Sequence, residues 1–433
     1  MSKVATTAGL VPFVLSKLRG VLCSGLVVLI LVAICWSGEP PQPLSSSTIA
    51  RYVADLNSDS RAIRAAAESA LLAAGPAVLD ELPLAGSLPD PTSRESLERI
   101  ISSIETRQFQ TALKPRTVML SDVHHLGVAV ERLSQQTANQ LVSPDLSTAE
   151  SPVTFAATPV TFWEAVSSIE QQLPLHYHAG KLEPVKTDTP RLPSSLSGPF
   201  RMELIHCEQR VTPRGERLLN TKVRLIGEPR LRPLFLIAAV DDWSVTSGTA
   251  SALSFTPMAR REIPANSEGT IDVAFDFIVP ASADERTAWT IAGDVDLTLA
   301  ALSAEVTFSD LTAKLPLTRR RGQSSLSLLK VATAESTGSV RLATAFPHLQ
   351  GLFESYRASL LAPVVTLEIP NDKPRNPVET IQLQEAPQGL ILEYQFDCPL
   401  SPGSRITATI PAAISTQKIP FRFEDITPTT QAD

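Results

Sequence analysis

The N-terminal part of the chain carries one long uncharged apolar run. Residues 20–36 read GVLCSGLVVLILVAICW, and Lys17 and Arg19 stand just before them. At 1.5 Å of rise per residue this run covers about 26 Å, slightly less than a bilayer core of about 30 Å. Basic residues on the N-terminal side favour a cytoplasmic N-terminus. The pattern predicts a cytoplasmic n-region at residues 1–19, then a signal anchor or a cleaved signal peptide at residues 20–37.

Helical periodicity appears after residues 38–47, a Pro- and Ser-rich stretch that is typical of a linker. Asp59 can cap a first helix, and Thr92 with Glu95 forms a capping-box pattern ahead of a second. Apolar side chains three and four residues apart give each helix one apolar face. We therefore expect a helical hairpin over residues 48–112. Its expected core positions are Ile63, Ala67, Ala70, Leu71, Ala74, Leu97, Ile100, Ile101 and Ile104.

An internal repeat runs through residues 113–187, where Leu126 corresponds to Phe162, 36 residues later. Each copy has the i, i+3, i+4, i+7 spacing of a helix with one apolar face, flanked by short segments that favour strands. Two strand–helix–strand units would bury these faces on a small shared sheet. The matching positions are Leu126, Ala129, Val130, Leu133, Gln135 and Gln136, and Phe162, Ala165, Val166, Ile169, Gln171 and Gln172; the expected strands are 117–120, 140–143, 153–156 and 175–178.

From Phe200 onward the apolar positions alternate or run together as in β-strands, with turn residues between them. A second set of such segments begins after residues 319–322. The two sets end alike, because residues 308–312 (FSDLT) match residues 423–427 (FEDIT), 115 residues later. The aspartate of each motif can cap the turn that leaves the last strand. A repeat of this length is what two tandem β-sandwiches would give.

The predicted fold class is therefore multi-domain α+β. It combines an N-terminal membrane helix, a helical hairpin, a small duplicated βαβ domain and two tandem β-sandwiches. After the segments at residues 1–19, 20–37 and 38–47, the expected units are the helical hairpin at 48–112, the duplicated βαβ domain at 113–187, a linker at 188–197, the sandwiches at 198–318 and 322–428, and a tail at 429–433.

Three stretches resemble known families. The segments LGVAVERLSQQTANQLV and VTFAATPVTFWEAVSSIEQQLPLHYHAG, within residues 115–187, resemble the short N-terminal domain shared by secretins and TonB-dependent receptors. That resemblance implies protein–protein contacts in the cell envelope, but the chain after residue 190 departs from both families. Residues 54–74 resemble a single HEAT-type helical repeat, with a plain helical hairpin as the alternative. The whole layout resembles a group of exported proteins of planctomycete-type bacteria, which implies export and no particular activity.

Composition and net charge argue for folded domains and against a nucleic-acid-binding protein. The chain has 433 residues, of which 43% are hydrophobic and 19% charged, so each unit can bury a core. Its 38 basic and 45 acidic residues give a net charge of −7, which argues against a nucleic-acid partner. The only tight basic run, Arg319-Arg320-Arg321, is interpreted as a solvated turn between domains.

Cysteine usage excludes a disulfide-rich scaffold. Cys207 and Cys398 are the two cysteines after the apolar segment, and they fall in different predicted sandwiches. Two separate buried thiols are the favoured interpretation, with a disulfide between Cys207 and Cys398 as the alternative.

Candidate chemistry is sparse, and the sequence predicts no catalytic residue, cofactor or metal ligand. Trp243, beside two aspartates, could stack on a sugar or could anchor a core. Asp294 and Asp296 could act as paired carboxylates or form a solvent-facing stripe. His176 and His178 alternate on one strand and so face the same side, but no neighbouring residue completes a zinc site.

Two function hypotheses follow. The first is a non-enzymatic, membrane-tethered interaction or scaffold protein of the cell envelope, anchored through residues 20–37 and contacting envelope proteins. The alternative is a carbohydrate- or cell-wall-binding module or a hydrolase acting on polysaccharides. In both, the chain is anchored in the inner membrane with its C-terminal part exported, or is secreted if the signal is cleaved.

Overall fold

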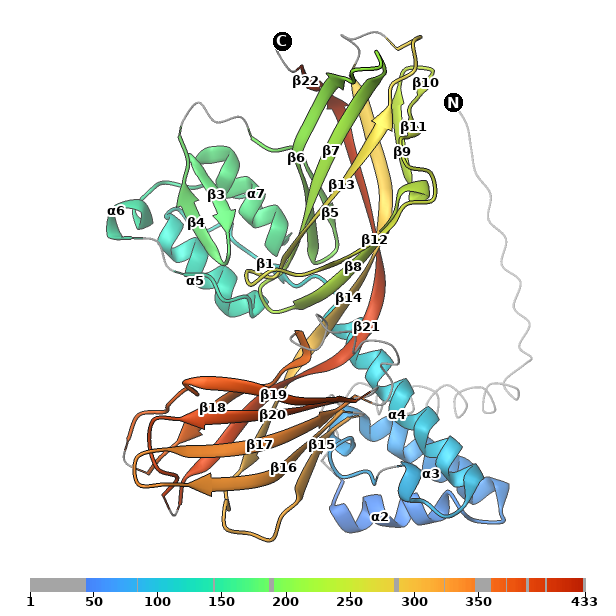
Figure 1. Ribbon diagram of the computed structural model, residues 1–433, viewed down its shortest axis with the longest axis vertical. Helices are drawn as coiled ribbons and strands as arrows, with labels where there is room; N and C mark the ends of the chain where they lie inside the picture. Colours follow the sequence, from blue (N-terminus) through green and yellow to red (C-terminus); the bar gives the residue numbers. More distant parts are fainter. Residues whose placement is uncertain are drawn as a thin grey trace, which may run out of the picture.

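The chain is a multi-domain α+β protein in which β-strands predominate (Figure 1). The candidate membrane segment, residues 20–37, lies outside the described residues, and none of the helices described is long and apolar enough to cross a membrane. The computed structural model describes residues 44–83, 85–142, 145–186, 191–283, 288–322, 324–346, 360–370, 372–386, 389–401 and 403–430.

The N-terminal domain is a group of three helices with a core of its own. Ser45 caps the first helix, so helical structure begins inside the predicted linker 38–47. The third helix begins at Pro91 because Asp90 caps it, its side chain accepting a hydrogen bond from Ser93 N at 2.7 Å. The elements are α2 (Ser46–Asp55), α3 (Arg61–Ala74), η1 (Gly75–Val78), η2 (Ala85–Ser87) and α4 (Pro91–Ala112).

Two details of the predicted hairpin are corrected. Thr92 does not form the expected capping box, because a proline at the first helical position is already set to helical φ and moves the start to Pro91. Ile63 is 46% exposed rather than in the core, and Ser60 instead of Asp59 is the residue before α3. The other apolar positions of α4 named from the sequence are buried, and the helix continues to bury Phe109.

The predicted repeat forms a small α/β domain in which the two helices present matching buried faces. Leu126, Ala129, Val130 and Leu133 share one core with Phe162, Ala165, Val166 and Ile169. Instead of one shared sheet, β1 pairs with β2 and β3 pairs with β4. No strand forms at 140–142 or 153–156. The elements are β1 (Thr117–Val118), α5 (Leu126–Thr137), α6 (Leu146–Ala149), β2 (Val160–Thr161), α7 (Phe162–Gln172), β3 (Leu175–His178) and β4 (Lys181–Pro184).

The remaining chain forms two β-units, each with its core between two sheets. The first core lies between a six-stranded sheet, ordered β11-β13-β7-β6-β22 with β5 also on β6, and one end of a seven-stranded sheet. The strands are β5 (Ser194–Ser197), β6 (Phe200–Val211), β7 (Arg217–Gly227), β8 (Arg232–Ala239), β9 (Trp243–Ser247), β10 (Ala250–Ser251), β11 (Leu253–Ser254), β12 (Arg260–Pro264), β13 (Thr270–Ile278) and β22 (Thr429–Thr430), with η3 (Val240–Asp242) between β8 and β9.

The second core lies between the other end of the seven-stranded sheet and a five-stranded sheet, ordered β15-β16-β17-β20-β19. The seven-stranded sheet has the order β10-β9-β14-β21-β18, with β8 pairing β14 and β12 pairing β8. The strands are β14 (Trp289–Phe308), β15 (Leu317–Arg321), β16 (Ser324–Thr333), β17 (Gly338–Ala345), β18 (Val364–Glu368), β19 (Glu379–Ala386), β20 (Gly389–Phe396) and β21 (Arg405–Ile426).

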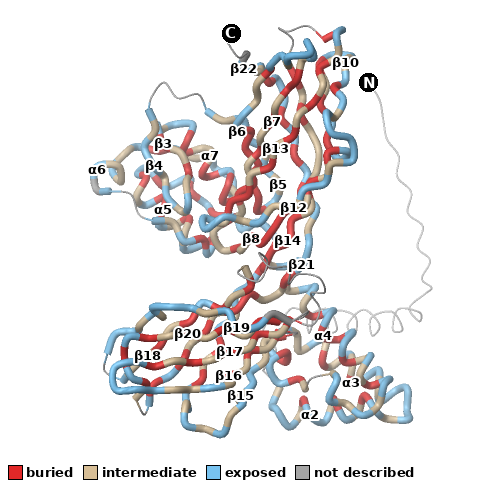
Figure 2. The backbone as a smooth tube through the Cα atoms, in the orientation of Figure 1, coloured by how far each residue is buried: buried red, intermediate tan, exposed pale blue. Residues whose placement is uncertain are grey.

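Two long strands, β14 and β21, pass through both cores. They have 20 and 22 residues, pair antiparallel almost throughout, and keep buried side chains along the passage between the units (Figure 2). Ala413, in the left-handed region with φ +49°, lies on β21 between the two units. Because each of these strands contributes residues to both cores, the expected division between the sandwiches at residues 319–321 does not separate the two cores.

The matching motifs at residues 308–312 and 423–427 mark the exits of these two strands, one in each core. Phe308 is buried in the second core, whereas Phe423, assigned from sequence to the second sandwich, is buried in the first. Asp310 accepts hydrogen bonds from the backbone and hydroxyl of Thr312, as a turn cap. The predicted tail also differs, since Thr429 and Thr430 form β22 beside β6.

The basic run at residues 319–321 lies on β15 and contacts the helical domain instead of forming a solvated turn. Arg320 Nη1 donates to the carbonyl of Leu82 at 2.8 Å, and Arg321 Nη1 lies 2.7 Å from Asp80 Oδ2. These contacts hold the helical domain against the second β-unit.

Candidate functional site

The α/β domain docks on the first β-unit through a buried aromatic side chain. Trp163 of α7 is fully buried, and its Nε1 donates to the carbonyl of Pro199 at 3.0 Å. The ring of Tyr177 meets it edge-on, with centroids 5.0 Å apart. The guanidinium of Arg201, on β6, lies 5.8 Å from the Trp163 ring. Trp163 and Tyr177 therefore lie next to a charged cluster at the same interface.

The charged cluster consists of two carboxylates that share one arginine and one histidine. Arg201 Nη1 donates to Glu170 Oε2 at 2.7 Å, and its Nε lies 2.9 Å from Glu203 Oε1 outside hydrogen-bond geometry. His176 Nδ1 is 3.2 Å from Glu170 Oε1, and its Nε2 is 3.9 Å from Glu203 Oε2. Tyr177 N also donates to Glu170, at 2.8 Å. Glu203 is 0% exposed and Arg201 4%, so these charges depend on one another.

The cluster shifts the pKa values of its members in opposite directions. The hydrogen bond to Glu170 raises the pKa of His176 above its ordinary value of 6.5, with burial opposing and the charge of Glu203 adding to the rise. Burial raises the pKa of Glu203, although Arg201 and His176 counteract it. Burial also acts to raise the pKa of Glu170, but the bonds from His176, Arg201 and the backbone outweigh it, so that pKa lies below its usual range. When His176 is protonated, its positive charge and that of Arg201 balance the negative charges of Glu170 and Glu203.

We expect the stability of this interface to fall as the solution becomes alkaline. The pKa of His176 is higher in the folded state than its ordinary value of 6.5. Its protonation therefore stabilises the folded state fully below pH 6.5, and this stabilisation is lost as the pH rises through the folded-state pKa. The free energy of unfolding of the wild type minus that of His176→Gln should therefore be larger at about pH 6 than at about pH 8.5. Urea unfolding at both pH values measures it. His206→Gln, which alters a more exposed imidazole, is the control, and an equal difference at the two pH values would refute the expectation.

A second buried polar contact joins three domains. Asn139, after α5, donates to Glu228 Oε2 at 3.2 Å and accepts from Arg230 N at 3.0 Å. Arg230 Nε donates to the same Glu228 oxygen at 2.5 Å, and its other nitrogens donate to the carbonyls of Ala112, the last residue of α4, and Lys114. Burial raises the pKa of Glu228, although Arg230 opposes the rise. The helical domain, the α/β domain and the first β-unit thus meet at one arginine.

The candidate sugar-stacking residue belongs to the core. Trp243 is 7% exposed, and its ring packs against Phe275 at 5.0 Å, Phe421 at 4.8 Å and Phe277 at 6.4 Å between centroids. The alternation of β9 turns this side chain inward, so the ligand-stacking interpretation is corrected in favour of a core anchor.

The two cysteines form no disulfide. Cys207 and Cys398 are both free, and they pack against different cores. Burial raises the pKa of the Cys207 thiol to about 12, which keeps it protonated and unreactive at neutral pH. The structure therefore confirms the favoured interpretation of two separate thiols, and the alternative of a Cys207–Cys398 disulfide is wrong.

The other titratable residues named from the sequence are engaged in ion pairs. Lys418 of β21 pairs with Asp294 and lies 3.5 Å from Asp296, which confirms a partly exposed strand stripe. His178 Nε2 lies 3.2 Å from Glu268 Oε2 of the first β-unit. His176 and His178 do face the same side, toward that unit. Among the described residues no three potential ligands come together as a metal site.

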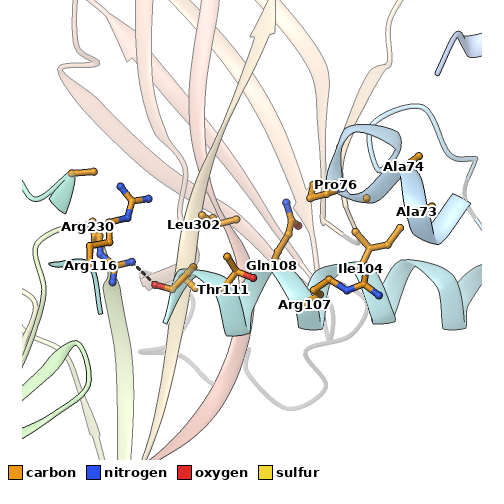
Figure 3. A pocket seen from close by; sticks show the side chains of 14 residues that line it. Ala73, Ala74, Pro76, Ile104, Arg107, Gln108, Thr111, Arg116, Arg230 and Leu302 are labelled. Carbon is orange, nitrogen blue, oxygen red and sulfur yellow. Dashed lines mark hydrogen bonds between the residues drawn. The ribbon is translucent and has the colours of Figure 1, made fainter. Parts of the chain in front are cut away.

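A cavity of about 550 Å³ lies beside the three-domain contact, along one face of α4 (Figure 3). Arg116 and Arg230 stand at one end, and Arg107 lies toward the other, near Ile104. The residues that line it are Ala73, Ala74, Gly75, Pro76, Ile104, Arg107, Gln108, Thr111, Ala112, Arg116, Ala138, Arg230, Ala301 and Leu302.

No family model matches this chain, and no curated protein matches it. The resemblances of residues 115–187 and 54–74 to known modules therefore stay predictions. The described residues form buried interdomain contacts, an arginine-lined cavity along α4 and a partly apolar outer surface.

Proposed function

We propose that this chain is a non-enzymatic, membrane-tethered interaction or scaffold protein of the cell envelope. In this proposal residues 20–37 hold it at the inner membrane, and the helical domain, the α/β domain and two β-sandwiches with shared strands stand outside the cytoplasm. The observation that carries it is the continuous pairing of β14 with β21 through both cores. That pairing, the buried cluster at Arg201 and the contacts of Arg230 and Arg320 with the helical domain hold the surfaces of four units at set distances from one another, as a scaffold requires.

An apolar strip at one edge of the first β-unit is the surface best suited to a protein partner. Leu253 is 69% exposed, Phe255 46% and Met258 82%, and all three lie within six residues of one another. β11, which contains Leu253, is the edge strand of the six-stranded sheet. Exposed apolar groups on an edge strand are typical of protein-interaction sites, because an added chain covers both the side chains and the open backbone groups.

Arg260 and Arg261 follow this strip, so a partner with acidic residues beside an extended apolar segment would complement it. The whole surface, defined as residues 253–261, is called the edge strip.

We expect the double variant Leu253→Ser/Met258→Ser to lose the envelope proteins that the wild type retains. Crosslinking of the full-length chain in membranes, followed by affinity recovery and mass spectrometry, measures this. Val211→Ser is the matched control, because Val211 is 67% exposed on the same unit but outside the edge strip. Recovery of the same partners by the double variant would remove the edge strip from the proposal, and recovery of no specific partner by the wild type would contradict the scaffold role.

The alternative of a polysaccharide-binding module or hydrolase has lost its main support. The ring of Trp243, the candidate for sugar stacking, is enclosed by phenylalanines. Asp294 and Asp296, the candidate paired carboxylates, share the ammonium group of Lys418.

A further inference from the structure

The cavity along α4 has the size and outline of a small-molecule site. Its volume of about 550 Å³ falls within the range of roughly 300–1,000 Å³ found for ligand pockets. Five of its lining positions, at residues 104, 107, 108, 111 and 112, repeat at helical spacing and so form one stripe of α4. Eight residues of helix rise by about 12 Å, so the cavity is elongated along that axis.

The lining between the arginines is mostly apolar. Ala301 and Leu302, from the stretch of β14 between the two cores, line the cavity together with Ala73, Ala74 and Pro76, which lie near Ile104 (Figure 3). Gln108 and Thr111 are the polar groups in this section (Figure 3). An apolar body of modest width would contact these side chains and α4.

The charges at the ends are positive. Three of the fourteen lining residues are arginines, and none is acidic. Arg230 is held in place by Glu228, which balances its charge, and by two carbonyls, whereas Arg116 is exposed. Arg107 donates only a long bond, 3.5 Å, to the carbonyl of Leu72. The exposed guanidinium of Arg116 suits a carboxylate or phosphate group, which accepts paired hydrogen bonds from such a donor.

We propose that this cavity binds an anionic amphiphile, with its carboxylate or phosphate group at Arg116 and its acyl chain along α4 between Leu302 and Pro76. An extended peptide would find few backbone partners here, because the wall formed by α4 has its amide and carbonyl groups bonded within the helix. Charge complementarity at one end and apolar walls along about 12 Å favour an acyl chain of about the length of decanoate.

The test measures binding of decanoate to the full-length chain held in a nonionic amphipol, by isothermal titration calorimetry. Decanol and decyltrimethylammonium are the matched neutral and cationic probes. We expect decanoate to bind at one site and the two controls to bind at least about tenfold more weakly. Arg116→Met should weaken decanoate by about tenfold, Leu302→Trp should abolish binding by filling the cavity, and Arg422→Met, an exposed arginine elsewhere, should change nothing.

A second arm separates the two sources of such a ligand. Vesicles that contain radiolabelled phosphatidic acid are incubated with the chain, and transfer of label to the protein is measured. Binding of decanoate without transfer assigns the site to free fatty acids, and transfer that Leu302→Trp abolishes assigns it to membrane lipids. The proposal fails if neither probe binds, or if Arg116→Met and Leu302→Trp both bind as the wild type does.

Discussion

Replacing Arg201 with methionine should lower the free energy of unfolding by about 3–5 kcal/mol, because removal of one partner of a buried ion cluster leaves the others uncompensated. Without this guanidinium, Glu170 and Glu203 would face each other at a buried interface with only His176 between them. Urea unfolding followed by circular dichroism measures the loss.

Two variants show whether charge is the cause. Arg422→Met removes an arginine that is 61% exposed and paired with Glu424, and should cost less than about 1 kcal/mol. Adding Glu203→Gln to Arg201→Met should restore part of the stability, since it removes one stranded carboxylate. A loss for Arg201→Met no larger than for Arg422→Met would show that the cluster contributes little.

Truncating one phenylalanine in either β-core should destabilise both β-units together. Phe308 and Phe421 are 1% and 4% exposed in the second and first cores, and each change to alanine should cost about 3–5 kcal/mol. Because β14 and β21 run through both cores, we expect each variant to shift one common unfolding transition. Differential scanning calorimetry, with the calorimetric and van't Hoff enthalpies compared, measures this.

Phe255→Ala is the control for this experiment, because Phe255 is 46% exposed and contributes little to either core. Two separate transitions, one moved only by Phe308→Ala and the other only by Phe421→Ala, would show that the long strands do not couple the units.

Local periodicity was enough to predict the elements whose partners are near in sequence. The apolar faces of α5 and α7 and the buried face of α4 follow from spacing alone, and the structure confirms them. Their caps were less predictable, since Asp90 and Thr161 compete with several nearby polar residues for the same backbone donors.

The pairing of distant segments could not be predicted in the same way. The repeated ends of β14 and β21 suggested tandem units, whereas antiparallel pairing places them in different cores. The cluster unites Glu170 with residues more than 30 positions away, and its only signal was a charge on the apolar face of α7 and two more in the apolar segment FRMELI. The cavity is lined by segments that lie between residues 73 and 302, and no single segment has a sequence pattern that predicts it.

The shared strands also set an order in which the β-units can be completed as the chain emerges. Most of the second core comes from residues 300–414, whereas the first core needs Ile419, Phe421 and Phe423 near the C-terminus. Vectorial emergence from a ribosome or a membrane pore would therefore leave the first β-unit without β21, the strand that pairs with β14, until almost the last residues appear. Until then, the apolar face of the first β-unit would stay exposed to solvent. A chain that ends before residue 415 would keep this face exposed permanently.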